Sequence, residues 1–286
     1  MIDALGWLLE PYEFAFMQRA LVVLVVISVV GGVVGAFVVH KGLAFSGDAF
    51  AHSTLAGVAV AFTAGANVSL GALVAAVVTA VGVGWARERA RVSYDTAIGI
   101  VFVAMFALGV LVISRRASYT PDLFSFVFGN ILGVSRSDVV GASLLGAGVL
   151  LFVAAFYREL LFVSYDPAMA ATAGVATRTF QYALLVLIAV AVVVALKAIG
   201  IVLVNAMLIV PAATAALLSG RLVRIMAIAV ALALIASLAG LQLSYHASVA
   251  TSPAIVMVAT VIFLGALLVQ SWRGRRGARA LGGAAA

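Results

Sequence analysis

The chain has 286 residues, of which 66% are hydrophobic and only 9% are charged, with a net charge of +7. A soluble domain usually carries about 25% charged residues, so this composition excludes a water-soluble fold. The chain has no cysteine, which excludes disulfides, thiolate metal sites and cysteine-based catalysis. The basic residues lie in short loops between apolar runs and near the C-terminus, so we expect no nucleic-acid partner.

Apolar runs long enough to cross a bilayer follow one another along the chain, since a crossing helix needs ~20 apolar residues. The stretches 53–86 and 225–272 are each long enough for two spans, with breaks at the turn residues 65–67 and near 244–246. The other expected spans cover 20–39, 96–114, 139–157, 179–196 and 198–220. The sequence therefore predicts an all-α polytopic membrane protein with about nine transmembrane helices (eight to ten). We expect residues 1–286 to form a single transmembrane domain.

Residues 121–133 form an apolar segment that is too short to span a bilayer. The segment holds three phenylalanines close to Gly129 and Asn130. Non-helical backbone at membrane depth is tolerated only where protein or a water-filled cavity surrounds it. We therefore expect a short re-entrant or interfacial helix here.

The distribution of basic residues predicts the orientation, because cytoplasmic loops favour Lys and Arg. Three basic groups fall in loops or in the tail: Arg87, Arg89 and Arg91; Arg221 and Arg224; and Arg273, Arg275, Arg276 and Arg279. Placing these groups in the cytoplasm puts the C-terminus inside and, with nine spans, the N-terminus outside a bacterial inner membrane. Arg115 and Arg116 disagree, but three basic groups outweigh one.

Asp48 and His52 are the leading candidates for metal ligands. Four-residue spacing places both side chains on one face of a helix, and a carboxylate with an imidazole suits Zn²⁺, Mn²⁺ and Fe²⁺. A structural explanation competes with this one. Ser46 could be the N-cap of the helix, Asp48 could favour the positive end of the helix dipole, and His52 could bond between helices.

Two further polar residues, Ser53 and Asn205, lie within apolar runs and are candidates for lining a pathway. Asn205 could equally hold two helices together through a hydrogen bond. Pro211 follows in the same run, and we expect a kink there, because proline removes a backbone donor. His40 and His246 are expected to be ordinary residues at the membrane boundary.

Residues 158–178, called the coupling segment below, are polar enough to leave the membrane. Asp166 before Pro167 is a favourable helix start, with proline at the first helical position. The sequence predicts a short helix across the cytoplasmic mouth. It is either a plain connection or a contact surface for a partner protein.

Several blocks of the sequence resemble the membrane permease subunits of bacterial zinc, manganese and iron ABC importers. The first block begins Gly47-Asp48-Ala49-Phe50-Ala51-His52 and runs to residue 59. Later blocks in the same order cover 95–100, 128–133, 165–174 and 200–215. The combination is specific and covers most of the chain between residues 41 and 218, whereas residues 244–253 match less well.

The resemblance implies a permease, homodimeric or paired, that binds cytoplasmic ATPase subunits and receives its ion from an extracytoplasmic metal-binding protein. It assigns Asp48 and His52 to the ion pathway. It assigns the ATPase contact to the coupling segment, with Asp166, Pro167, Ala170 and Gly174 as its residues. No Gly-x-x-x-x-Gly-Lys-Ser/Thr loop occurs in the sequence, so we expect the chain itself to be no enzyme and ATP hydrolysis to belong to the separate subunit. No permanently bound cofactor is expected, only the transported Zn, Mn or Fe ion.

Two other function classes compete with an importer permease. A secondary transporter driven by an ion gradient often shows inverted repeats and acidic residues at mid-membrane, and this chain shows no clear repeat and few such acids. An intramembrane enzyme would need a catalytic set, and neither a His-Glu-x-x-His pair nor a Ser/His/Asp set is apparent.

Overall fold

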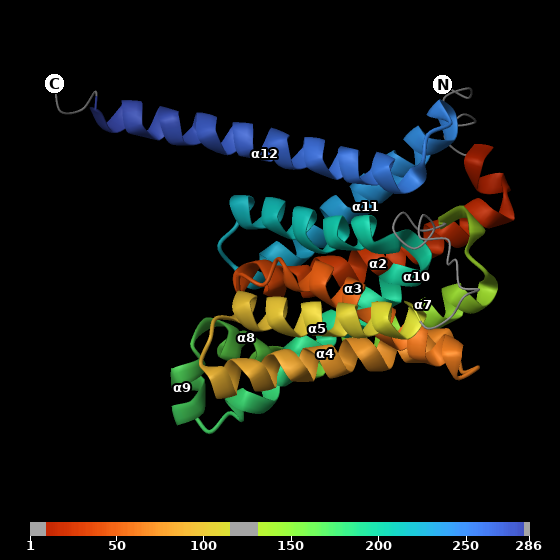
Figure 1. The fold of residues 1–286 in the computed structure, drawn as a ribbon. Helices are drawn as coiled ribbons and strands as arrows, with labels where there is room; N and C mark the ends of the chain where they lie inside the picture. Colours follow the sequence, from red (N-terminus) through yellow and green to blue (C-terminus); the bar gives the residue numbers. More distant parts are fainter. Residues whose placement is uncertain (1–9, 115–130, 283–286) are drawn as a thin grey trace.

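The computed structural model describes residues 10–114 and 131–282, and within these ranges the protein is a bundle of helices without strands (Figure 1). Two short 3-10 turns, η1 (Glu10–Glu13) and η2 (Ile131–Gly133), precede α2 and α7. The helices are α2 (Ala15–His40), α3 (Ser46–Thr63), α4 (Val68–Ala90), α5 (Tyr94–Ser114), α7 (Arg136–Ala155), α8 (Tyr157–Tyr165), α9 (Pro167–Thr172), α10 (Thr177–Leu218), α11 (Leu222–Ala247) and α12 (Thr251–Gly282).

Eight helical segments within the described ranges are long and apolar enough to cross a membrane, with α10 supplying two of them. Helix α3 is not among the eight, although its 18 residues rise ~27 Å, close to the thickness of a bilayer core. The polar side chains of Asp48 and His52 lower its hydropathy. Helix α3 packs against α4 and α5 within the bundle, and the eight candidate spans of the described residues fall at the lower end of the expected range of eight to ten. The predicted all-α polytopic architecture is confirmed.

The predicted break at 65–67 is confirmed, and the second break lies at 248–250, a few residues after the predicted 244–246, which belong to α11. Helix α3 ends at Thr63, and α4 begins after Asn67, whose side-chain oxygen accepts hydrogen bonds from the backbone nitrogens of Ser69 and Leu70. Helix α11 ends at Ala247, and α12 starts at Thr251. Asparagine is a favourable N-cap because its side chain satisfies backbone donors that the first helical turn leaves free.

Helix α10 is broken at Gly200, where φ is +73° and ψ is 169°. Only glycine adopts this backbone conformation readily. Figure 1 shows the second half of α10 running back along the bundle from this point. The two predicted spans are therefore present, and the break at Gly200 lies close to the boundary expected at residue 197. Pro211 stays inside the second helical half.

Glycines bring the backbones of neighbouring helices into close contact. Gly57 of α3 faces Gly71 of α4, and a β-carbon on either residue would overlap the carbonyl oxygen of the other. Small residues at such positions let membrane helices approach closely. The α3–α4 pair, called the α3–α4 hairpin below, therefore packs backbone to backbone at this point.

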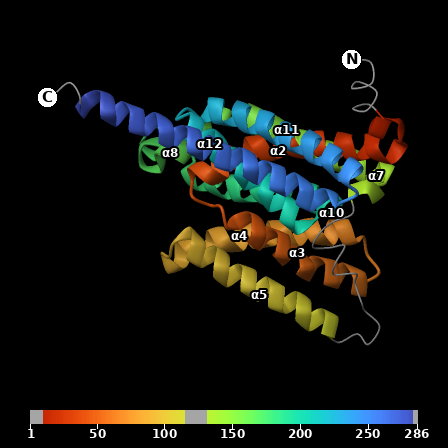
Figure 2. The ribbon, with the colours of Figure 1, turned by 90° about the horizontal axis from the view of Figure 1, so that it is seen from above.

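The part of the chain that follows α5 is only partly described. The predicted re-entrant or interfacial helix over 121–133 falls mostly outside the described residues, and only residues 131–133 are seen, as the turn η2. At the opposite end of the bundle lie α8 and α9 and also the end of α4 (Figures 1 and 2), and α8 packs against α10, α9 and α7. The carboxyl-terminal part of α12 extends toward this same side.

Candidate metal site and coupling segment

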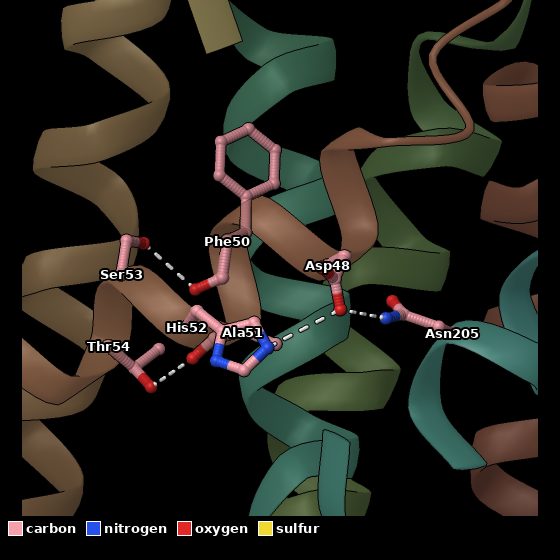
Figure 3. Close-up of polar contacts among 7 residues, drawn as sticks. All are labelled: Asp48, Phe50, Ala51, His52, Ser53, Thr54 and Asn205. Atoms are coloured by element: carbon pink, nitrogen blue, oxygen red, sulfur yellow. Dashed lines mark hydrogen bonds and ion pairs between the residues drawn. The ribbon is translucent and has the colours of Figure 1, made fainter. Parts of the chain in front are cut away.

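Asp48 and His52 lie together on the first two turns of α3, as their spacing predicts. The Nε2 atom of His52 is 3.5 Å from Oδ1 of Asp48 (Figure 3). The Asp48 side chain is 41% exposed and that of His52 is 33% exposed in the single chain. Both side chains are thus partly buried, and their exposed parts can contact a further partner.

Asn205 approaches Asp48 from the second half of α10. Its Nδ2 donates a hydrogen bond of 2.8 Å to Oδ1 of Asp48, opposite to His52 (Figure 3). Gly47 makes room for this amide, because a β-carbon there would lie 2.6 Å from Oδ1 of Asn205. The amide of Asn205 and the imidazole of His52 thus both approach the same carboxylate oxygen, Oδ1 of Asp48.

The capping explanation for this part of α3 is wrong as far as Ser46 is concerned. The N-cap of α3 is Phe45, and no side chain makes a capping hydrogen bond. The hydroxyl of Ser46 instead donates to the backbone oxygen of Leu43 at 2.6 Å. Asp48 does lie in the first turn, where the helix dipole favours a negative charge. Its hydrogen-bond partner, however, is Asn205 on another helix, α10.

Two aromatic rings of α5 face the imidazole of His52. The ring centroids of Phe102 and Phe106 lie 6.0 and 6.1 Å from that of His52, and the Phe106 ring stands edge-on to it at 87°. Such contacts restrict the positions that the imidazole can take. These contacts could not be predicted from the sequence, because every phenylalanine of an apolar helix looks alike in a hydropathy pattern.

Ser53, the other pathway candidate, points into a different environment. It is fully buried, and its hydroxyl donates to the backbone oxygen of Phe50 at 2.9 Å (Figure 3). Thr54 makes the same type of bond to Ala51. The hydroxyl of Ser53 is therefore already occupied within its own helix. Its role in a pathway stays a prediction.

The helix start predicted in the coupling segment is present. The Oδ1 atom of Asp166 accepts a hydrogen bond of 2.9 Å from the backbone nitrogen of Met169, and Pro167 occupies the first position of α9. Gly174 ends this short helical stretch with φ of +82°. Ala170 is fully buried, whereas Met169 is 62% exposed, so Ala170 packs against the bundle and Met169 faces outward.

The remaining histidines lie at helix ends. His40 is the last residue of α2, and its ring lies 4.2 Å from that of Tyr165. His246 is in the last turn of α11, beside Tyr245 at 5.1 Å. Within the described ranges, no group of three or more His, Cys, Asp or Glu side chains comes together. Asp48 and His52 are therefore two potential ligands that need further donors from elsewhere.

Comparison with known proteins gives this geometry its context. The manganese transport system membrane protein MntC of Halalkalibacterium halodurans is 38% identical over 272 residues, covering 92% of this chain and 93% of that protein. The protein of Haemophilus influenzae described as a "probable iron transport system membrane protein" is 34% identical over 267 residues, covering 93% of this chain and 98% of that protein. The solved structure of PsaBC from Streptococcus pneumoniae in complex with Fab contains a chain with a TM-score of 0.80 and 34% identity, covering 93% of this chain and 95% of that one.

The sequence profile of the ABC 3 transport family matches residues 13–270, nearly the whole chain. The match includes α3 with Asp48 and His52, and it includes the coupling segment. The protein is thus a multi-pass membrane protein, and the chain belongs to the ABC 3 transport family.

Proposed function

We propose that this chain is the membrane-spanning permease subunit of an ATP-driven importer for a divalent transition metal ion, and that Asp48 and His52 bind the ion in transit. The main observation behind this proposal is the partly exposed Asp48–His52 pair on α3. Nε2 of His52 lies 3.5 Å from Oδ1 of Asp48, and Asn205 donates a hydrogen bond to the same oxygen. Relatives of the same family are named for manganese and iron transport, and zinc has the same ligand preference for carboxylate and imidazole.

The chemistry of the pair suits an ion that must be released again. A carboxylate oxygen and an imidazole nitrogen bind a divalent ion, but two protein ligands do not close a coordination shell. Conduction requires binding that is favourable enough for entry and weak enough for exit. The exposure of both side chains leaves space for water or for donors of a second permease copy, so the proposal includes a homodimer.

The proposal places ATP hydrolysis in a separate cytoplasmic subunit that docks at α9 in the coupling segment. Met169 presents an exposed apolar side chain on this helix, and Asp166 and Gly174 define its two ends. Ala170 supports α9 from the buried side. A lipid bilayer surrounds the bundle, and an extracytoplasmic metal-binding protein delivers the ion at the opposite end.

The orientation proposed is an external N-terminal end and a cytoplasmic C-terminal end in a bacterial inner membrane. Figure 1 supports it, because α9, the arginine-rich end of α4 and the carboxyl-terminal part of α12 lie toward one side of the bundle. Basic residues accumulate on the cytoplasmic side of membrane proteins. Reporter fusions at both termini test this topology, and a cytoplasmic N-terminus would contradict it.

Proteoliposomes that hold the chain, its ATPase subunit and its binding protein test the function. We expect uptake of Mn²⁺, Zn²⁺ or Fe²⁺ that requires ATP, and no ATP hydrolysis by the chain alone. Hydrolysis by the isolated chain would contradict the proposal. Uptake driven by an ion gradient without ATP would instead favour a secondary transporter.

Docking at α9 is tested separately by Met169→Arg. We expect the ATPase subunit to be lost from the purified complex, because a charge replaces an exposed apolar contact. The matched control is Val249→Arg, a change of an exposed residue between α11 and α12, which should keep the subunit bound. Equal loss or equal retention in both variants would overturn the docking assignment.

A further inference from the structure

The start of the α3–α4 hairpin is attached to the coupling segment. Lys41 lies in the short connection between α2 and α3, and its Nζ donates a hydrogen bond of 3.3 Å to the backbone oxygen of Val163 in α8. The adjacent His40 ring packs against Tyr165 at 4.2 Å. Tyr165 immediately precedes Asp166, the cap of α9. The chain that enters α3 therefore contacts the chain that enters α9.

The end of the same hairpin is attached to the coupling segment as well. Oε2 of Glu88, in the last turn of α4, lies 2.7 Å from Nη2 of Arg178 and accepts a hydrogen bond of 3.2 Å from the hydroxyl of Tyr182. The Tyr182 ring fits against Gly84, where a β-carbon would lie 2.6 Å from the ring. Arg178 stands at the start of α10, shortly after Gly174 ends the turn that follows α9.

The two attachments lie within electrostatic reach of each other. Burial lowers the pKa of Lys41, and the positive charge of Arg87, the neighbour of Glu88, lowers it further. Between the two ends, α3 and α4 meet backbone to backbone at Gly57 and Gly71, with no flexible side chain between them. A displacement imposed on both ends of this hairpin is therefore expected to move α3 and α4 together.

We propose that Lys41 and Glu88 are positioning residues that pass movements of the coupling segment to α3 and hence to Asp48 and His52. The two stretches that flank α9 hold the two ends of one rigid hairpin, and that hairpin carries the metal ligands. This inference rests on the proposed function, since it assigns a purpose to α9 as the docking site of the ATPase subunit.

Stability alone does not account for the Glu88–Arg178 pair. The Arg178 side chain is 73% exposed and that of Glu88 is 29% exposed, and an ion pair that solvent reaches in this way contributes little to the free energy of unfolding. Reversing one charge should thus leave the complex folded and assembled while it disturbs the attachment. Reversing both charges should restore the attraction with the opposite polarity.

The experiment measures Mn²⁺ ions transported per ATP hydrolysed by the full complex in proteoliposomes. Glu88→Arg and Arg178→Glu are each expected to lower this ratio by roughly 2- to 30-fold, the range found when residues that couple two sites are changed. The ATPase subunit should still co-purify. The double variant should recover most of the loss. The control Arg224→Glu, at an exposed arginine near the start of α11, should keep the wild-type ratio.

A second variant tests the other attachment without any charge reversal. Lys41→Met keeps an unbranched apolar stem but removes the donor to Val163, and it should lower the same ratio. Unchanged ratios in the single variants, or a double reversal that recovers nothing, would overturn the proposal. A wild-type complex that moves none of Mn²⁺, Zn²⁺ and Fe²⁺ with ATP would show instead that the proposed function itself is wrong.

Discussion

Two carboxylates of the α3–α4 hairpin differ in the partners that the fold gives them. Glu88 meets a permanent positive charge, the guanidinium of Arg178 at 2.7 Å, and also a tyrosine hydroxyl. Asp48 meets a neutral amide at 2.8 Å and an imidazole at 3.5 Å, and its side chain is 41% exposed. A carboxylate whose charge is already balanced attracts a mobile cation less than one without a permanent counter-charge does.

The largest expected effect comes from Asp48. Asp48→Asn keeps the size of the side chain but removes the charge, and His52→Ala removes the imidazole. We expect each to lower Mn²⁺ uptake by more than about 100-fold, since loss of a residue that merely supports a ligand already costs roughly 10–100-fold in affinity or activity. Uptake by cells that lack the wild-type chain measures this.

Expression and assembly should persist in these variants, because removing a charge from a membrane segment removes a cost of ~2.5–3.5 kcal/mol on insertion scales. A residue needed only for its place in the first helical turn would tolerate asparagine, which also favours helix starts. Uptake by Asp48→Asn at the wild-type rate would thus refute the ligand assignment.

Asn205→Leu should have the next largest effect. Leucine has a similar size but offers no donor to Oδ1 of Asp48, so the carboxylate loses the bond that orients it. We expect the apparent affinity for Mn²⁺ to fall by roughly 10–100-fold, with a smaller change in maximal uptake. Concentration series of uptake separate the two quantities. An equal loss in Asn205→Leu and Asp48→Asn would mean that Asn205 itself binds the ion.

Gly47→Ala should weaken uptake less than Asn205→Leu does. The new methyl group would lie 2.6 Å from Oδ1 of Asn205, and the amide can rotate away at a partial loss of its bond to Asp48. Gly99→Ala on α5 is the matched control, because a β-carbon there meets nothing within 4 Å. Identical affinities for Mn²⁺ in the two variants would argue against a tight fit around Asn205.

Glu88→Gln should have the smallest effect on metal binding. The amide oxygen can still accept from Tyr182, and the exposed ion pair with Arg178 contributes little to stability. We expect an unchanged affinity for Mn²⁺ and a nearly unchanged melting temperature, with a modest fall in ions moved per ATP. A loss of Mn²⁺ affinity as large as that of Asp48→Asn would erase the distinction between the two carboxylates.

The sequence predicts those features of the molecule that depend on residues close together in the chain. Hydropathy locates the spans and their breaks, and four-residue spacing brings Asp48 and His52 together, because both follow from local helix geometry. The Asp48–Asn205 bond joins residues 157 positions apart, and such contacts depend on how helices pack. For the same reason, the ring contacts of Phe102 and Phe106 with His52 left no trace in the pattern.

The errors have physical causes too. Ser46 resembles an N-cap, yet its hydroxyl bonds Leu43, because the helix starts one residue earlier than that cap requires. Proline generally disrupts a helix more strongly than glycine does, so the sequence predicts a kink at Pro211. The non-helical backbone lies instead at Gly200, whose φ of +73° is a value that glycine adopts readily and proline cannot.

The break at Gly200 also fixes how much the chain length can vary near the metal site. Each residue of an α-helix turns the chain by ~100°, so one residue inserted or deleted between Gly200 and Asn205 would swing the amide away from Asp48. The connection between α10 and α11 at residues 219–221 carries no such constraint. Related permeases should therefore tolerate insertions there while keeping an invariant spacing between this glycine and this asparagine.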